Sequence, residues 1–143
     1  MNLGSMNHLG VTVSDLEAST NRFYAPILGF LGYREVERLP EMSLWLAPDG
    51  SAINLWQAKP EHRGRAVERY APGFHHFAFN ADSRQRVDDC HDLLRESGIT
   101  VLDPPADYDY VPGYYALFFA DTDGLKYELV HIPPEALAAA TQN

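Results

Sequence analysis

The stretches HLGVTVSD at residues 8–15 and HFAFNADS at residues 76–83 decide the fold, because they begin two copies of one pattern. In each stretch apolar side chains alternate with small or polar ones, which is the period of a β-strand. Each stretch then ends in Ser and Asp residues that can cap a following helix. The recurrence indicates an internal duplication in which His8 and His76 hold equivalent positions.

The two copies also end alike. PDGSAINLW at residues 48–56 matches TDGLKYELV at residues 122–130, and this match places Asn54 on Glu128. Between these landmarks both copies read as a strand, a helix and three strands. The sequence therefore predicts an α+β fold in which two paired βαβββ modules form a cupped mixed sheet with the helices on the outside. We expect a single domain over residues 6–143, divided into module 1 (6–58), a linker (59–72), module 2 (73–132) and a C-terminal tail (133–143).

The first module is predicted to contain strands at residues 8–13, 33–38, 42–47 and 51–57. Its helix begins at Ser14, which forms a capping-box pattern with Glu17. Pro26 is expected to kink or end this helix because proline lacks an amide hydrogen, and Gly29 is expected to stop it because glycine is a common helix stop.

The second module is predicted to contain strands at residues 74–80, 99–102, 114–120 and 125–132. Its helix is capped by Asp82 or Ser83 and ends at Gly98. Cys90 lies on the apolar stripe of this helix and is expected in the core. Residues 103–113, rich in Pro, Asp and Tyr, are read as a loop, and the Ala-rich tail as a short helix.

Composition excludes several classes of function. The chain has 143 residues with 45% hydrophobic and 22% charged residues, as in ordinary globular domains. One cysteine excludes a disulfide framework and a cysteine-rich zinc module. The net charge of −9 disfavours a nucleic-acid partner. There is no apolar run of the roughly 20 residues that span a bilayer and no signal-peptide pattern, so we expect a cytoplasmic protein without a membrane partner.

Strand alternation assigns four equivalent residues to the face opposite the helix-packed core. They are His8, Asn54, His76 and Glu128. Two imidazoles and one carboxylate that converge on a joined sheet suit a divalent metal ion and leave positions open for a small-molecule substrate. Asn54 offers only a neutral amide oxygen, which is a poor ligand beside imidazole, so we place it in the substrate pocket. His75, next to His76, is expected to point to the opposite face and to be structural.

Other residues are assigned to the pocket by the same alternation. Trp56 shares the face of Asn54 and either forms a pocket wall or packs in a dimer interface. Lys126 shares the face of Glu128. In the tyrosine-rich segment from Tyr108 to Tyr115, Tyr115 or its neighbour by alternation is the residue expected to reach the cup. Most of the other tyrosines are read as packing the loop.

The duplicated pattern resembles the glyoxalase/bleomycin resistance/dioxygenase superfamily, also called the vicinal oxygen chelate superfamily. The matching stretches cover nearly the whole chain: NHLGVTVSDLEAS, FYAPILGFLGY, DGSAINL, GFHHFAFNADS and GYYALFFADTDGLKYELVH. The last is the most specific, because it contains D-x-D-G-x-x-x-E-L. The resemblance implies that His8, His76 and Glu128 bind a divalent ion such as Fe, Ni, Mn or Zn. In glyoxalase I-like members the fourth position is glutamate or glutamine, so Asn54 argues against glyoxalase I activity itself.

The resemblance leaves two functional hypotheses. The leading one is a metal-dependent enzyme, of lyase, isomerase or extradiol-type dioxygenase character, that acts on a small substrate chelated through vicinal oxygens. No catalytic acid or base is assigned. The alternative is a metal-free protein of bleomycin-resistance type that sequesters a drug or aromatic ligand. A homodimer is expected because the modules leave open sheet edges and an apolar face, and the site is built within one chain or shared between two.

Overall fold

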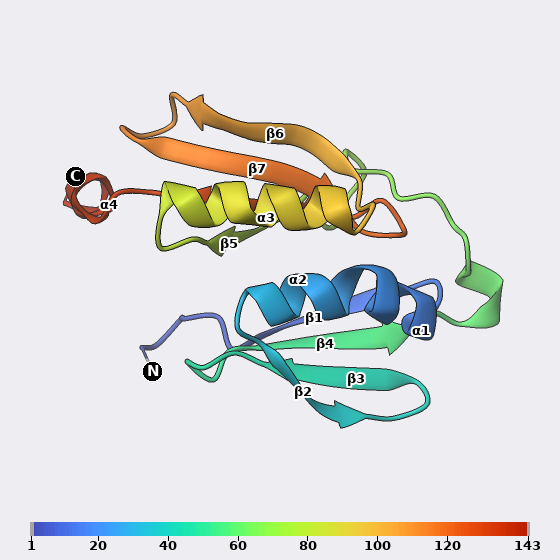
Figure 1. The fold of residues 1–143 in the computed structure, drawn as a ribbon. Helices are drawn as coiled ribbons and strands as arrows, with labels where there is room; N and C mark the ends of the chain where they lie inside the picture. Colours follow the sequence, from blue (N-terminus) through green and yellow to red (C-terminus); the bar gives the residue numbers. More distant parts are fainter. Residues whose placement is uncertain (1, 143) are drawn as a thin grey trace. The chain divides into compact units, whose positions relative to one another are not determined.

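The computed structural model describes residues 2–142, which form two units that divide between Ala66 and Val67. This division falls inside the predicted linker, where Pro60–His62 form a short 3-10 helix, η2. Each unit contains one four-stranded mixed sheet, and the strand orders are β1-β4-β3-β2 and β5-β8-β7-β6. Figure 1 shows helical segments along one face of each sheet. The predicted α+β class is confirmed, and both units repeat the same strand order.

The first unit has strands β1 (His8–Val13), β2 (Arg34–Arg38), β3 (Met42–Leu46) and β4 (Ala52–Gln57). β1 is parallel to β4, and the β4–β3 and β3–β2 pairs are antiparallel. The core side of the sheet follows the predicted alternation, because Val11, Val13, Ile53 and Leu55 are all buried. Burial of these aliphatic side chains supplies most of the free energy that holds such a layer together.

The first helix differs from its prediction. It continues through three segments, α1 (Leu16–Ser19), the π-helical η1 (Thr20–Tyr24) and α2 (Ala25–Phe30). Pro26 does not end it, because the preceding π-helical turn accommodates the missing amide hydrogen bond. The N-cap is Asp15, whose carboxylate accepts from the amide of Ala18, and not Ser14. The chain leaves the helix beyond Gly29, at Gly32, which has a positive φ of 88°.

The second unit has strands β5 (Phe77–Asn80), β6 (Val101–Tyr108), β7 (Tyr114–Ala120) and β8 (Lys126–His131). Helix α3 (Arg84–Glu96) begins at the N-cap Ser83 and ends before Gly98, as predicted. Helix α4 (Pro134–Thr141) forms the predicted short helix of the tail. β5 is parallel to β8, while the β8–β7 and β7–β6 pairs are antiparallel.

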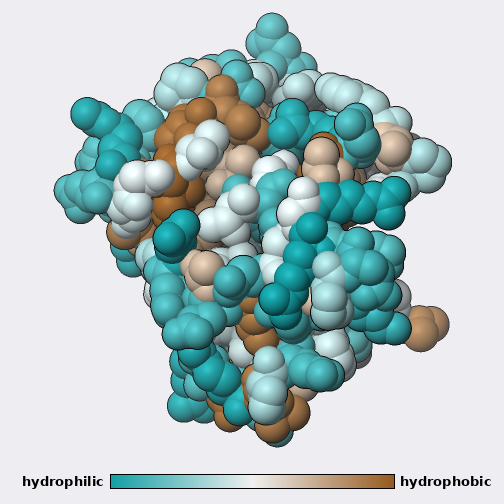
Figure 2. All heavy atoms as spheres, turned by 90° about the vertical axis from the view of Figure 1, so that its right-hand side faces the viewer, coloured by the Kyte–Doolittle hydropathy of each residue, from teal (hydrophilic) through white to brown (hydrophobic). Residues whose placement is uncertain are grey.

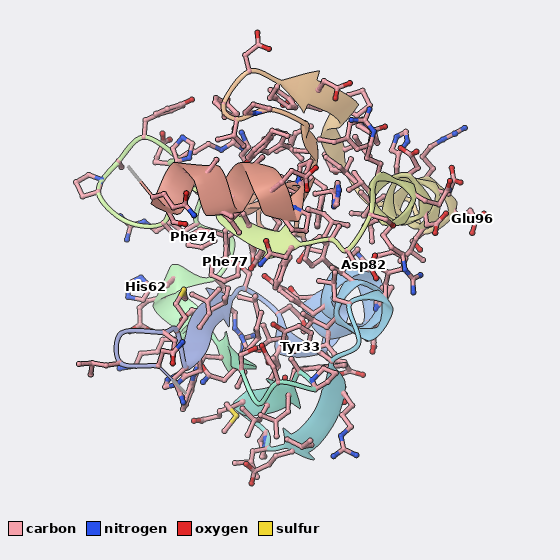
Figure 3. All side chains as sticks on the ribbon, turned by 90° about the vertical axis from the view of Figure 1, so that its left-hand side faces the viewer. Tyr33, His62, Phe74, Phe77, Asp82 and Glu96 are labelled. Atoms are coloured by element: carbon pink, nitrogen blue, oxygen red, sulfur yellow. The ribbon has the colours of Figure 1, made fainter. Side chains whose placement is uncertain are left out.

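Two strand boundaries in the second unit were predicted wrongly. Residues 103–108, read as loop, belong to β6 even though they include Pro104 and Pro105. β6 is an edge strand whose register shifts on both sides of Asp103, and an edge with bulges tolerates proline. β5 starts at Phe77 rather than at residue 74. The rings of Phe74 and Phe77 stack at 6.5 Å where the chain enters β5 (Figure 3).

The strand register supports the predicted equivalence of the two modules. Gly10 lies opposite Asn54 on the β1–β4 pair, and Ala78 lies opposite Glu128 on the β5–β8 pair. Gly10 and Ala78 each follow the first histidine of their repeat by two residues. Each therefore lies opposite one member of the aligned pair Asn54 and Glu128. This register puts Asn54 and Glu128 at matching places in their sheets.

Cys90 lies on α3 and is completely buried, and burial raises the pKa of its thiol to about 12. A thiol must be exposed and ionised to react. We therefore expect Ellman's reagent to label Cys90 in the native protein only as fast as the second unit opens, and at once in denaturant. A Cys90→Ala, Glu96→Cys variant, with its thiol at the exposed helix end, is the control and should react immediately. Immediate labelling of native Cys90 would show that α3 is not packed as described.

The surface mixes polar and apolar side chains. No helix within residues 2–142 is long and apolar enough to cross a membrane. The large apolar side chains that remain exposed include Trp56, Tyr70 and Tyr110. Figure 2 shows one face on which separate brown apolar patches are surrounded by teal hydrophilic residues.

Candidate functional site

His76 and Glu128 come together in the second unit. His76 immediately precedes β5, and Glu128 lies in β8, which pairs with β5. His76 Nε2 is 3.4 Å from Glu128 Oε2. The Glu128 side chain is only 3% exposed, whereas that of His76 is 38% exposed. A buried carboxylate requires polar partners, because leaving it unpaired away from water is very costly.

Tyr114, the first residue of β7, provides one of these partners. Its phenol donates a hydrogen bond to Glu128 Oε1, so that Oε2 is the oxygen that remains on the side of His76. Burial raises the pKa of the Tyr114 phenol, and the hydrogen bond to Glu128 raises it further. The phenol is therefore protonated at neutral pH and acts as a donor. Tyr114 thus fixes which oxygen of Glu128 is available.

The second nitrogen of His76 is also engaged. His76 Nδ1 lies 2.7 Å from His75 Nδ1, so one of the two rings donates and the other accepts. When His76 donates, its Nε2 carries the lone pair and faces Glu128 as a possible ligand. The prediction that His75 points to the opposite face is wrong. Both histidines precede the start of β5, so strand alternation does not apply to them.

An aromatic surface surrounds Glu128 on its face of the sheet. Phe118 is opposite Glu128 in the β7–β8 register, and its ring packs edge-to-face on Tyr108 at 5.6 Å. Tyr108 stacks on Tyr110 at 5.7 Å, and Tyr110 packs edge-to-face on Tyr114 at 5.1 Å. The predicted placement of Lys126 on this face agrees with its Nζ, which lies 4.4 Å over the Phe118 ring.

The donor atoms of His76 and Glu128 fit a shared divalent ion. Two ligands that are each about 2.1 Å from one ion lie roughly 3.4 Å apart at a tetrahedral angle. Their Nε2 and Oε2 atoms are separated by that distance. One neutral imidazole and one carboxylate also belong to the ligand types that Fe, Ni, Mn and Zn accept. Neither unit by itself brings three His, Cys, Asp or Glu side chains of the described residues together for a metal ion.

The first unit contains the other two residues that the repeats align. His8 is exposed at the start of β1, and its Nδ1 lies 2.8 Å from Asn7 Oδ1. In the neutral tautomer in which Nδ1 donates to this oxygen, Nε2 carries the lone pair. Asn54 Oδ1 accepts from Trp56 Nε1 at 2.8 Å, which holds the amide in one orientation. Gly10 makes room for this arrangement, because a Cβ there would lie 2.8 Å from Asn54 Oδ1.

Tyr115 lies on the opposite face from Glu128. Its phenol donates to Asp88 on α3 at 2.6 Å, and the guanidinium of Arg84 lies 3.8 Å over its ring. Of the two neighbouring tyrosines that strand alternation left open, Tyr115 therefore contacts α3, and Tyr114 is the one that contacts Glu128. Counting back in steps of two from Phe118, which pairs with Glu128, would have identified Tyr114 from the register alone.

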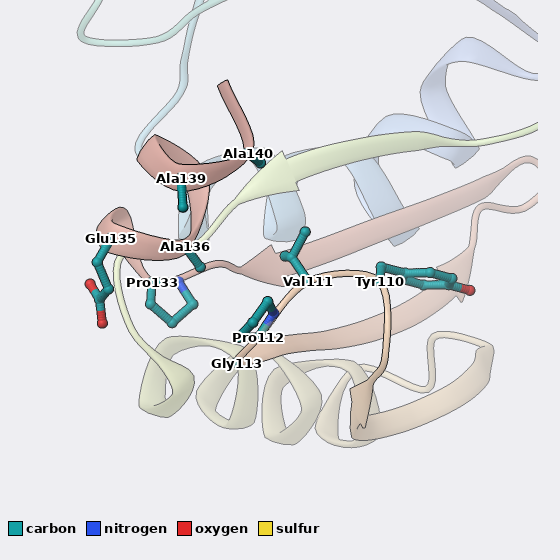
Figure 4. A pocket seen from close by; sticks show the side chains of 9 residues that line it. All are labelled: Tyr110, Val111, Pro112, Gly113, Pro133, Glu135, Ala136, Ala139 and Ala140. Carbon is teal, nitrogen blue, oxygen red and sulfur yellow. The ribbon is translucent and has the colours of Figure 1, made fainter. Parts of the chain in front are cut away.

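A hollow in this unit lies between the β6–β7 loop and α4. It has a volume of about 690 Å³ and is lined mainly by apolar atoms, which come from Tyr110, Val111, Pro112, Pro133, Ala136, Ala139 and Ala140 (Figure 4). Gly113 also lines it and lets the loop approach Pro133 closely, since a Cβ at this position would lie 2.6 Å from Pro133 Cγ. Tyr110 thus contributes both to this hollow and to the aromatic surface beside Glu128.

Comparison with known proteins gives a consistent family assignment. The model of the Glyoxalase/Bleomycin resistance protein/Dioxygenase superfamily matches residues 5–129. The chain is 36% identical over 129 residues to the uncharacterized protein YqjT of Bacillus subtilis (strain 168), which covers 87% of the chain and 97% of that protein. It is 28% identical over 138 residues to the protein named Glyoxylase I 4 of Arabidopsis thaliana, which covers 90% of the chain and 71% of that protein.

Solved structures share the fold. A crystal structure from Bacillus halodurans, described as a candidate glyoxalase, superposes with a TM-score of 0.78 at 26% identity and covers 91% of the chain and 97% of its own chain.

Proposed function

The chain belongs to the glyoxalase/bleomycin resistance protein/dioxygenase superfamily, and on this premise we propose that it is a divalent-metal enzyme that acts on a small substrate bound through two adjacent oxygen atoms. The observation that carries the proposal is the pairing of His76 Nε2 with Glu128 Oε2 at 3.4 Å, with the other oxygen of Glu128 held by Tyr114. A bound divalent ion supplies Lewis acidity that stabilises negative charge on substrate oxygens.

We propose that His8 is the third protein ligand. Its equivalence to His76 in the repeat and its free Nε2 support this assignment. The imidazole comes from the same chain or from the partner in a homodimer. We propose a homodimer because both edge strands of each sheet are paired on one side only among the described residues. Three protein ligands leave coordination positions open for the substrate.

The residues of the chain have separate roles in this proposal. His75 holds the His76 ring, Tyr114 orients Glu128, and the aromatic surface around Phe118 keeps water away from the bound substrate. Asn54 lacks the acid–base capacity of a carboxylate, so the glyoxalase I type of proton transfer is not proposed. Its amide NH₂ group instead offers hydrogen bonds to substrate oxygens. The remaining reaction classes are a lyase, another isomerase or an extradiol-type dioxygenase.

The metal content of the wild-type protein tests this proposal. After purification without chelators and soaking in Fe, Ni, Mn or Zn salts, we expect about one ion per chain to remain after gel filtration. Atomic emission spectroscopy provides the measurement. A protein that stays free of all four metals would contradict the enzyme proposal.

One observation favours a second candidate function. Tyr108, Tyr110, Tyr114 and Phe118 form a continuous aromatic surface, which suits an aromatic ligand without any metal. A metal-free protein that sequesters such a ligand would have the same fold. Its mark would be tight binding of aromatic compounds by the chelator-treated protein. For either function we propose a cytoplasmic location, which the single unpaired cysteine supports.

A further inference from the structure

Lys126 and Arg69 are cationic side chains of the second unit that form no ion pair with Asp or Glu among residues 2–142. Lys126 precedes Glu128 by two residues on the same face, yet its ammonium group lies over the Phe118 ring at 4.4 Å. Glu128 is already occupied by Tyr114 and His76. Glu128 therefore has no oxygen placed to form an ion pair with Lys126.

Arg69 has a further unmet requirement. Its Nε atom is buried and has no hydrogen-bond partner in the described part of the chain. A buried N–H group without an acceptor is costly, so such a group points to an acceptor supplied from outside. Arg69 immediately precedes Tyr70, whose ring lies 5.0 Å from that of His75. This contact places the Arg69 segment beside the His75–His76 pair.

Both cations belong to the surroundings of the histidine pair. The Lys126 ammonium lies over the Phe118 ring, which packs edge-to-face on His76 at 6.4 Å, and Tyr70 holds the Arg69 segment against His75. This is a local exception in a chain with a net charge of −9. A divalent ion on His76 and Glu128 would make the excess of positive charge larger, because Glu128 is the one carboxylate that the described residues place at this pair.

We propose that the substrate carries an anionic oxygen group, either a carboxylate or a phosphoryl group, in addition to the two oxygens that bind the ion, and that Lys126 and Arg69 bind this group. The inference rests on the proposed function and narrows its substrate class. Arg69 supplies a planar fork of donors and Lys126 a compact charge, which are the two common ways to bind an oxyanion.

Binding of catechol and of two carboxylated catechols to the Co²⁺-loaded protein tests the inference. The 2,3- and 3,4-dihydroxybenzoates keep the vicinal oxygens and place a carboxylate at two different distances from them. Changes in the visible Co²⁺ absorption report binding of each probe. We expect at least one of the two acids to bind ten or more times more tightly than catechol. This difference in affinity should decrease as salt is added, because salt screens the attraction between the carboxylate and the two cations. Competition by inorganic phosphate or by acetate identifies the preferred anionic group.

Variants assign the preference to the two residues. Lys126→Met retains an apolar side chain of similar length and is expected to lower the preference for the dihydroxybenzoates over catechol at least tenfold. Arg69→Gln is expected to lower the same preference to a similar extent. Lys59→Met, which removes the other lysine of the chain, is the matched control and should retain it. A loaded protein that binds both acids no better than catechol, or an unchanged preference in both variants, would overturn this inference alone. A wild-type protein that takes up no metal would overturn the proposed function as well.

Discussion

Replacing Glu128 with glutamine is expected to abolish stoichiometric binding of a divalent ion. Glutamine retains the size of the side chain and an oxygen that accepts from Tyr114, but it removes the negative charge that faces His76 at 3.4 Å. Loss of a residue that only hydrogen-bonds to a metal ligand lowers the affinity for the metal roughly 10–100-fold. Because Glu128 is itself a proposed ligand, its replacement should lower the affinity by more than this. His76→Ala should have an effect of the same size. Competition with a chromophoric chelator measures both affinities.

A carboxylate elsewhere in the same unit provides the control for this experiment. Asp103→Asn makes the same chemical change on edge strand β6 and should leave the affinity for metal at the wild-type value. Thermal unfolding of each metal-free variant separates lost ligands from lost structure. Wild-type affinity in folded Glu128→Gln protein would show that the ion binds elsewhere.

Replacing Tyr114 with phenylalanine is expected to weaken metal binding about 10–100-fold. The phenol fixes Oε1 of Glu128, so its removal frees the carboxylate to rotate or to bind through both oxygens. The visible spectrum of the Co²⁺-loaded variant should change, because the number of coordinating oxygens changes. A residue that supports only the fold would leave that spectrum as it is. In the metal-free protein, loss of a hydrogen bond to a buried carboxylate should also lower the free energy of unfolding by about 2 kcal/mol.

The neighbouring tyrosine is a matched control for Tyr114. Tyr115→Phe removes a phenol that donates to Asp88 on the α3 side of the same strand. This variant should retain wild-type metal affinity and the wild-type Co²⁺ spectrum. Equal effects of the two substitutions would contradict the positioning role that we assign to Tyr114.

The sequence was sufficient to predict the repeat and the equivalence of its key positions. Alternating burial along a strand fixes which side chains share a face, so Asn54 and Glu128 could be aligned before the structure was known. The Asp-Gly turns that precede β4 and β8 anchor this register. The same rule placed Lys126 on the face of Glu128, where its ammonium group lies over Phe118.

Other features of the site depend on contacts that alternation does not report. Reading residues 103–108 as a loop removed the part of β6 that pairs with Tyr114 and Tyr115. The contact of His75 with His76 arises because both precede β5, where the backbone is not extended in a ladder. The helix that continues past Pro26 needs a π-helical turn, for which the sequence has no simple signal.

Anomalous diffraction from crystals of the metal-loaded protein tests the central claim most directly. We predict one strong peak at the absorption edge of the metal, about 2.0–2.2 Å from His76 Nε2 and from an oxygen of Glu128. The third protein ligand at this peak should be His8, from the same chain or from the partner subunit. A peak bound by other residues, or an ion that contacts only one of His76 and Glu128, would contradict the claim.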